Sequence, residues 1–160
     1  MIKLNLGSNS VRIPGFINVD LVKHPNVDVV ANALKLPYKD GEVDEILASH
    51  LIEHFDYIEG QQALKEWYRV LKKGGKITIE CPDFLAFCRN FINLPEDERS
   101  NYYVQVWGYP WEPGQAHKFG YTLNQLIGTL KSIGFKDIKQ LPALRYSNLV
   151  NWCMKFEATK

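Results

Sequence analysis

The chain has 160 residues, of which 46% are hydrophobic, 12% aromatic and 23% charged. This length predicts one domain over residues 1–160 with a core of its own, and the hydrophobic fraction argues against intrinsic disorder. The 19 basic and 18 acidic residues give a formal net charge of +1 without blocks of like charge. This balance argues against nucleic acid or an anionic membrane as a partner.

The location of the chain is predicted from its apolar runs and its cysteines. No run approaches the roughly 20 apolar residues of a membrane span, and residues 1–6 alternate polar and apolar side chains, unlike a signal peptide. Cys81, Cys88 and Cys153 are widely spaced without a C-x-x-C pair, which fits a reducing compartment. We expect a cytoplasmic protein, a monomer or homodimer, with no membrane partner.

Short apolar runs alternate with helical patterns, which predicts an α/β fold with a parallel sheet. Strands are expected over residues 2–6, 16–19, 27–31, 43–48, 76–81, 136–141 and 151–158. The last two follow one another without a helix between them, so we expect an antiparallel C-terminal edge.

Two helices are indicated by apolar stripes with helical spacing. Asp56 and Glu59 form a capping box at the start of the first helix, and Lys72–Gly74 are expected at its end. Thr122 and Gln125 predict the same box for the second helix.

Residues 95–121 lack a sustained period and contain seven aromatic side chains. Long loops inside small domains are usually functional. We therefore expect a lid or wall over a substrate pocket, and the alternative is an irregular layer that seals the sheet or forms a dimer contact.

Ligands of open parallel sheets bind beyond the carboxyl ends of the strands, where the strand order reverses. Gly7 follows the first strand and allows a tight turn, in which Asn9 tolerates positive φ. Asp20 follows the second strand and can accept hydrogen bonds from both hydroxyls of a ribose. Only thirteen positions separate Gly7 from Asp20, too few for a crossover helix, so the first crossover is predicted to be an abbreviated loop. This argues against a dinucleotide, whose diphosphate binds at a helix N-terminus.

The chain contains, in order, LNLGSNS, GFINVD, VDVVANALKLPY, VDEILASHLIEHF, ALKEWYRVLKKGGKITIECPDF, H-x-F-x-Y and L-x-S-I-G-F. This succession, from Leu4 to Phe135, resembles the small class I methyltransferases that depend on S-adenosylmethionine. The resemblance implies a Rossmann-like fold, S-adenosylmethionine as cofactor, and methyl transfer to a hydroxyl or amine of a small-molecule or glycan-type acceptor.

The resemblance also implies which residues contact the cofactor. They are Gly7, Ser8 and Asn9 along the methionine moiety, Asp20 at the ribose, Leu21 on the adenine, Asn32, Ala33 and Leu34 at the adenine edge, and Ser49 and His50 beneath the sulfonium. Asn9 stands where the family usually has a second glycine, and Asn32 where it usually has an acid. An uncharged acceptor at Asn32 costs about 1 kcal/mol of binding.

An acceptor hydroxyl or amine is activated by a general base, and the catalytic candidates are His117, in the aromatic segment, and Asp83, after the fifth strand. His50 is a third candidate. The structural alternatives are that Asp83 caps a helix beginning at Phe84 and that His117 only packs.

Three other functions remain as alternatives. A non-catalytic or degenerate S-adenosylmethionine-binding protein would explain Asn9 and Asn32, whereas a nicotinamide reductase would need the missing diphosphate loop. His50, Glu53 and His54 match the H-x-x-E-H motif of zinc hydrolases. The motif follows a strand directly and leaves little helix for an i, i+4 pair, so we expect no metal ligands and structural roles for Glu53 and His54.

Overall fold

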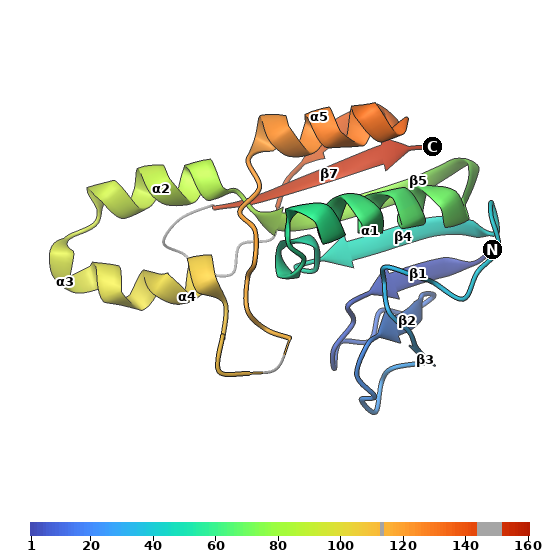
Figure 1. The fold of residues 1–160 in the computed structure, drawn as a ribbon, viewed down its shortest axis with the longest axis horizontal. Coiled ribbons are helices and arrows are strands. Elements are labelled where there is room, and N and C mark those ends of the chain that lie inside the picture. Colours follow the sequence, from blue (N-terminus) through green and yellow to red (C-terminus); the bar gives the residue numbers. More distant parts are fainter. Residues whose placement is uncertain (113, 144–151) are drawn as a thin grey trace.

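The computed structural model describes residues 1–112, 114–143 and 152–160. A seven-stranded sheet in the order β3-β2-β1-β4-β5-β7-β6 forms its centre (Figure 1). The strands are β1 Lys3–Leu6, β2 Ile17–Asp20, β3 Val29–Val30, β4 Val43–Ser49, β5 Leu71–Pro82, β6 Lys136–Leu141 and β7 Cys153–Thr159. Neighbours among β1–β5 are parallel, and β7 is antiparallel to β5 and β6. The predicted α/β fold with an antiparallel edge is confirmed, although Asn151, the expected start of the last strand, lies outside the described residues.

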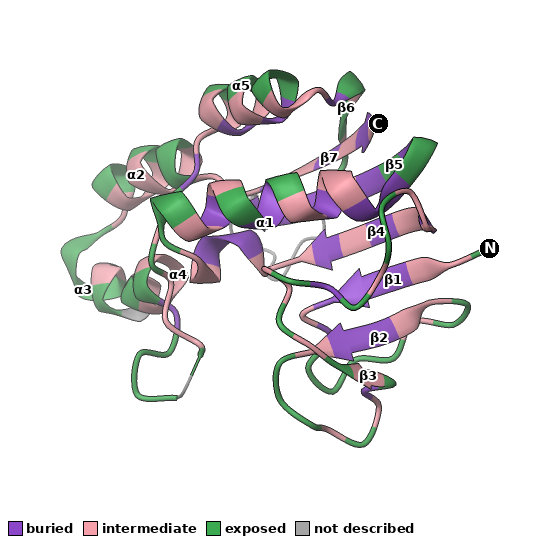
Figure 2. Ribbon diagram, turned by 45° about the vertical axis from the view of Figure 1, so that its right-hand side comes forward, coloured by how far each residue is buried: buried purple, intermediate pink, exposed green. Residues whose placement is uncertain are grey.

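The helices lie in two groups. They are α1 Tyr57–Val70, α2 Phe84–Asn93, α3 Glu96–Arg99, α4 Tyr103–Trp107 and α5 Leu123–Ile133, with 3-10 turns η1 Ile52–His54 and η2 Ser100–Tyr102. Figures 1 and 2 show α1 and α5 along one face of the sheet, and α2, α3 and α4 beyond the carboxyl end of β5. Residues 7–16, which connect β1 to β2, contain no helix, so the abbreviated first crossover is confirmed. In the part of the chain that the structure describes, no helix is both long and apolar enough to cross a membrane.

The core lies between α1, α5 and the apolar face of the sheet (Figure 2). Leu4, Ile46 and Ile77 are register neighbours on β1, β4 and β5 and are almost fully buried. Trp67 of α1 is among the largest fully buried side chains. Burial of such side chains contributes about 1.5–3 kcal/mol each, so this face supplies most of the folding energy of the sheet.

Of four local predictions from the sequence, the structure confirms one and contradicts three. The box of Asp56 and Glu59 is present at the start of α1. However, α1 ends at Val70, so Lys72–Gly74 do not form its last turn and lie in an irregular start of β5. Thr122 is the N-cap of α5, but its side chain makes no capping hydrogen bond, so the box predicted there is wrong. The expectation of an aperiodic loop over residues 95–121 is also wrong, because the segment contains α3, η2 and α4.

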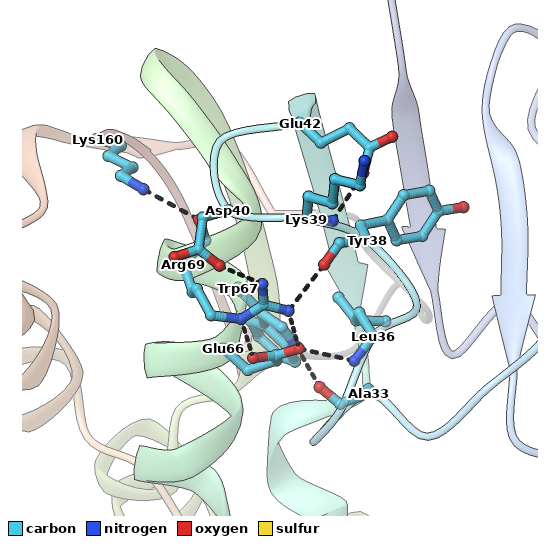
Figure 3. A network of polar contacts seen from close by, with 10 residues as sticks. All are labelled: Ala33, Leu36, Tyr38, Lys39, Asp40, Glu42, Glu66, Trp67, Arg69 and Lys160. Carbon is cyan, nitrogen blue, oxygen red and sulfur yellow. Dashed lines mark hydrogen bonds and ion pairs between the residues drawn. The ribbon is translucent and has the colours of Figure 1, made fainter.

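Three side chains near the end of α1, those of Glu66, Trp67 and Arg69, hold the loop between β3 and β4 (Figure 3). Glu66 accepts a hydrogen bond from the backbone N–H of Leu36 at 2.7 Å. Both of its oxygens also accept from Arg69, at 2.7 Å each. The indole N–H of Trp67 donates to the carbonyl oxygen of Ala33 at 3.0 Å. The loop that carries the predicted adenine-edge residues is therefore fixed by α1.

We expect Glu66→Gln to destabilise the fold by ~1.5–3 kcal/mol at pH 7, because charged hydrogen bonds to Arg69 and Leu36 are lost or weakened. Hydrogen bonding to Arg69 outweighs the opposing effect of burial and lowers the pKa of Glu66 from its usual 4.5. The stabilisation is therefore complete above that value and is lost as pH falls through the lower pKa of the folded state. Urea unfolding between pH 7 and pH 3 should show the two proteins converging. Glu96→Gln, at an exposed position of α3, is the control, and a difference that stays constant with pH would contradict the assignment.

Candidate functional site

The strand order reverses between β1 and β4, which is where ligands of such sheets bind. The predicted cofactor residues lie at or just after the carboxyl ends of β1, β2, β3 and β4. The loops between these strands could in principle diverge, because the connections from β1 to β4 contain no helices. Hydrogen bonds decide how the loops lie.

Asp20 joins the first two loops. Its Oδ2 accepts from the backbone N–H of Asn9 at 2.7 Å, and its Oδ1 accepts from that of Val22 at 2.9 Å. Asn9 has φ 47°, as expected, and Gly7 has φ 66°. A Cβ atom at Gly7 would lie 2.9 Å from Cδ1 of Leu51, so the first loop also packs on the segment after β4. The candidates of the first, second and fourth loops are thus brought together.

The remaining cofactor candidates have different surroundings. Leu21 is 66% exposed, so its side chain is accessible to a ligand. The side-chain oxygen of Asn32 accepts from the backbone N–H of Leu34 at 2.9 Å, so it stabilises a local turn. The hydroxyl of Ser8 is buried and has no hydrogen-bond partner among the described residues. A carboxylate has about four lone-pair sites, so Asp20 keeps capacity for ribose hydroxyls, and the set fits an adenosine group.

His50 directly follows β4, whose last residue is Ser49. It has φ 52°, which is uncommon for a residue with a side chain and often occurs at functional sites. Its Nδ1 lies 3.1 Å from Oε1 of Glu53, and its Nε2 lies 3.9 Å from Sγ of Cys153. Burial opposes protonation, but the contacts with Cys153 and Glu53 outweigh it and raise the pKa of His50 to about 10.

His54 points the other way, toward His117. Its Nδ1 lies 3.1 Å from the carbonyl oxygen of Ala116, and its ring centre is 5.0 Å from that of His117. The backbone N–H of Lys118 donates to the carbonyl oxygen of Glu53 at 2.8 Å, which joins η1 to the segment carrying His117. Since η1 has only three residues, His50 and His54 do not form a helical i, i+4 pair.

A small cavity of about 20 Å³ lies beside Glu53 and His117, with space for about one water molecule. It is lined by Glu53, Pro82, Phe84, Phe87, Gln105, Val106, His117, Phe119 and Gly120. Burial lowers the pKa of His117, so its ring is neutral at pH 7. Gln105 and Val106 belong to α4, so part of the segment expected as a lid or wall does line this cavity.

Asp83 caps α2, because its Oδ1 accepts from the backbone N–H groups of Leu85 and Ala86 at 3.0 and 3.3 Å. The structural alternative for Asp83 is therefore correct, and a catalytic role would come in addition. The sequence assigned Glu53 a structural role, yet it is the buried acid at the centre of the site. Its place in H-x-x-E-H singled out Glu53, but the spacing of the motif gave no sign of His117, which lines the same cavity.

The comparisons with known proteins agree with this geometry. A family model described as a methyltransferase domain matches residues 14–79. The ubiquinone/menaquinone biosynthesis C-methyltransferase UbiE of Campylobacter jejuni is 37% identical over 84 residues, which are 48% of this chain and 35% of that protein. An uncharacterized methyltransferase-like protein of Schizosaccharomyces pombe is 38% identical over 67 residues, 41% of this chain and 25% of that one. The chain therefore matches about a third or less of the length of these relatives.

Solved structures match over nearly the whole chain. A methyltransferase dependent on S-adenosylmethionine from Archaeoglobus fulgidus has a TM-score of 0.67 at 19% identity, covering 99% of this chain and 85% of that one. The 1,6-didemethyltoxoflavin-N1-methyltransferase of Burkholderia thailandensis, solved with S-adenosylhomocysteine, has a TM-score of 0.68 at 14% identity, covering 99% and 70%. Over residues 14–79 the chain is therefore similar in sequence to methyltransferase domains, and its fold is similar to that of solved methyltransferases that depend on S-adenosylmethionine.

Proposed function

We propose that this chain binds S-adenosylmethionine across the carboxyl ends of β1–β4 and transfers its methyl group to an acceptor beside Glu53 and His117. The observation that carries the proposal is the position of Asp20. At the carboxyl end of β2, next to the point where the strand order reverses between β1 and β4, its carboxylate joins the first two loops and keeps lone pairs for a ligand.

The cofactor roles follow the loops. Asp20 holds the ribose hydroxyls and Leu21 packs on the adenine, whose edge faces Asn32, Ala33 and Leu34. The methionine moiety runs along Gly7, Ser8 and Asn9, above Ser49 and His50. Because Glu66 and Trp67 fix the adenine-edge loop through backbone contacts, that loop is ordered before the cofactor binds.

When bound, the cofactor supplies a methyl group on a sulfonium, which is already a good leaving group. The protein therefore contributes alignment and exclusion of water. The cavity beside Glu53 and His117 has apolar walls from Phe84, Phe87 and Phe119, which suits this task. His117 is the side chain that we place beside the acceptor, and its neutral ring keeps one nitrogen lone pair. Asp83 is the second candidate, at the end of β5.

The acceptor is proposed to be a hydroxyl or amine of a small-molecule or glycan-type compound. The cavity itself holds about one water molecule, so a sugar ring or an aromatic metabolite would pack outside it, on exposed aromatic side chains at its edge such as Phe84. A relative that matches 48% of the chain is named as a C-methyltransferase, so an acceptor screen also needs activated carbon acceptors.

Calorimetric titration with S-adenosylhomocysteine tests the cofactor site. We expect saturable 1:1 binding that weakens at least tenfold, about 1.4 kcal/mol, in Asp20→Ala. Asp40→Asn, whose carboxyl group is exposed near α1, is the matched control and should bind as the wild type does. Absence of binding at millimolar ligand would mean that the fold is kept without its cofactor. Equal affinity in Asp20→Ala would remove Asp20 from the site.

The rate of S-adenosylhomocysteine release with an acceptor panel tests the role of His117. We expect His117→Ala to lower this rate at least tenfold with unchanged cofactor affinity, because its ring lies at the cavity and not in the cofactor loops. His24→Ala, in the loop between β2 and β3, is the control. An unchanged rate in His117→Ala would show that the acceptor lies elsewhere.

A further inference from the structure

Glu53, His54 and His117 bring three metal-binding groups to one point. A carboxylate oxygen and one ring nitrogen of each histidine all lie within 4.8 Å of one another. Some point between them is about 2.8 Å or less from all three atoms, so shifts of under ~1 Å would give the usual Zn²⁺ distances of about 2.0–2.2 Å. Side-chain rotation alone supplies shifts of this size.

The protonation of His54 is set by its backbone neighbour. Its Nδ1 lies 3.1 Å from the carbonyl oxygen of Ala116, and a carbonyl can only accept, so the proton is on Nδ1. In the neutral ring, Nε2 then carries the free lone pair. Metal-binding histidines are commonly oriented in this way.

Glu53 supplies an unsatisfied acceptor. The residue is only 2% exposed, and its Oε1 pairs with Nδ1 of His50 at 3.1 Å. Its Oε2 is buried and accepts no hydrogen bond from any residue that the structure describes. A buried carboxylate oxygen without a partner is costly, and a cation at this point would remove that cost.

Backbone hydrogen bonds hold the segments that carry the three groups. Lys118 and Phe119 donate to the carbonyl oxygen of Glu53 at 2.8 and 3.2 Å, and the N–H of His117 donates to that of Trp107 at 3.0 Å. The bond between His117 and Trp107 belongs to a short antiparallel bridge between Gly108 and Ala116. His117 is therefore fixed to α4 on one side and to η1 on the other, which is the support that a metal site needs.

We propose that Glu53, His54 and His117 bind one divalent transition-metal ion of the Zn²⁺ type, with an open coordination position toward the adjoining cavity. Two imidazoles and one carboxylate form the protein ligand set of several catalytic Zn²⁺ sites. The cavity of about 20 Å³ leaves space for one further ligand. This proposal rests on the methyltransferase function only for the role of the ion. In the metal-loaded protein the lone pair of His117 binds the ion, so the ion takes the place of the imidazole as the group that activates the acceptor, by holding its oxygen and lowering its pKa.

Metal binding to the chelator-treated full chain, without cofactor or acceptor, tests the site. Zn²⁺ is titrated calorimetrically, and Co²⁺ is followed by its visible absorption, which reports coordination. We expect one ion per chain, and at least 100-fold weaker binding in His54→Ala, His117→Ala and Glu53→Gln, whereas His24→Ala should bind normally. No binding to folded wild type, or full affinity in all three ligand variants, would overturn the proposal.

A second pair of variants leaves the three ligands in place. Gly108 has φ 64°, and a Cβ atom there would overlap the carbonyl oxygen of Gln115 and lie 2.9 Å from Cδ2 of His117. Gly114 has φ 78°, with nothing within 4 Å of its Cβ position. Gly108→Ala should therefore weaken Zn²⁺ binding at least tenfold by displacing His117. Gly114→Ala imposes comparable backbone strain and should keep the affinity, so equal affinities in the two variants would contradict the site.

The two binding experiments distinguish a failure of the metal site from a failure of the methyltransferase function. Intact binding of S-adenosylhomocysteine together with absent Zn²⁺ binding would refute the metal site alone. Tight Zn²⁺ binding with no binding of S-adenosylhomocysteine would refute the methyltransferase function and leave the metal site standing.

Discussion

The connections between the first four strands contain no helix, so their backbone N–H groups lack helical partners and must find others. Carboxylates supply them. Asp20 accepts from the loops on either side of β2, and Glu66 accepts from the third loop. Asp28, in the second loop, accepts from the N–H of Asn18 within β2 and so ties that loop to the strand. Each of these bonds is charged and therefore stronger than a neutral one. The geometry of the cofactor side depends on them, because no packed crossover helix fixes these loops.

The small number of helices in the described structure also determines which face of the sheet is covered. α1 and α5 cover the apolar face of the sheet (Figure 2). Alternate strand positions on the other face are largely polar, and ion pairs there join Lys3 to Glu45, Lys76 to Glu157 and Lys155 to Glu80. Asn5 and Asn18 form a buried hydrogen bond on that face, and pairing of this kind lowers the cost of burying polar groups. In the part of the chain that the structure describes, the helices packed on the sheet lie on its apolar face, whereas α2 and α4 contribute to the cavity wall.

The sequence predicted contacts between residues that are close together in the chain, and it missed contacts between residues that are far apart in the chain. Asp56 and Glu59 are three positions apart, and their capping box is present. The contact of Glu66 with Leu36 joins residues 30 positions apart, and no local pattern indicates it. Lys72–Gly74 have the composition of a helix end, but α1 stops earlier because Leu71 already pairs with Val43 in the sheet. Tertiary pairing thus overrides helix propensity at this boundary.

The H-x-x-E-H motif shows the same limit at the site itself. Its spacing joins His50 to His54 only if the backbone is helical, since side chains four apart then share a face. Here β4 ends at Ser49 and His50 has φ 52°, which directs its ring to Glu53 and Cys153. His54 instead meets a histidine 63 positions later, brought by backbone pairing with η1. The spacing of the motif therefore identifies the glutamate and two of the histidines at the site, but the end of the preceding strand determines which of these side chains lie together.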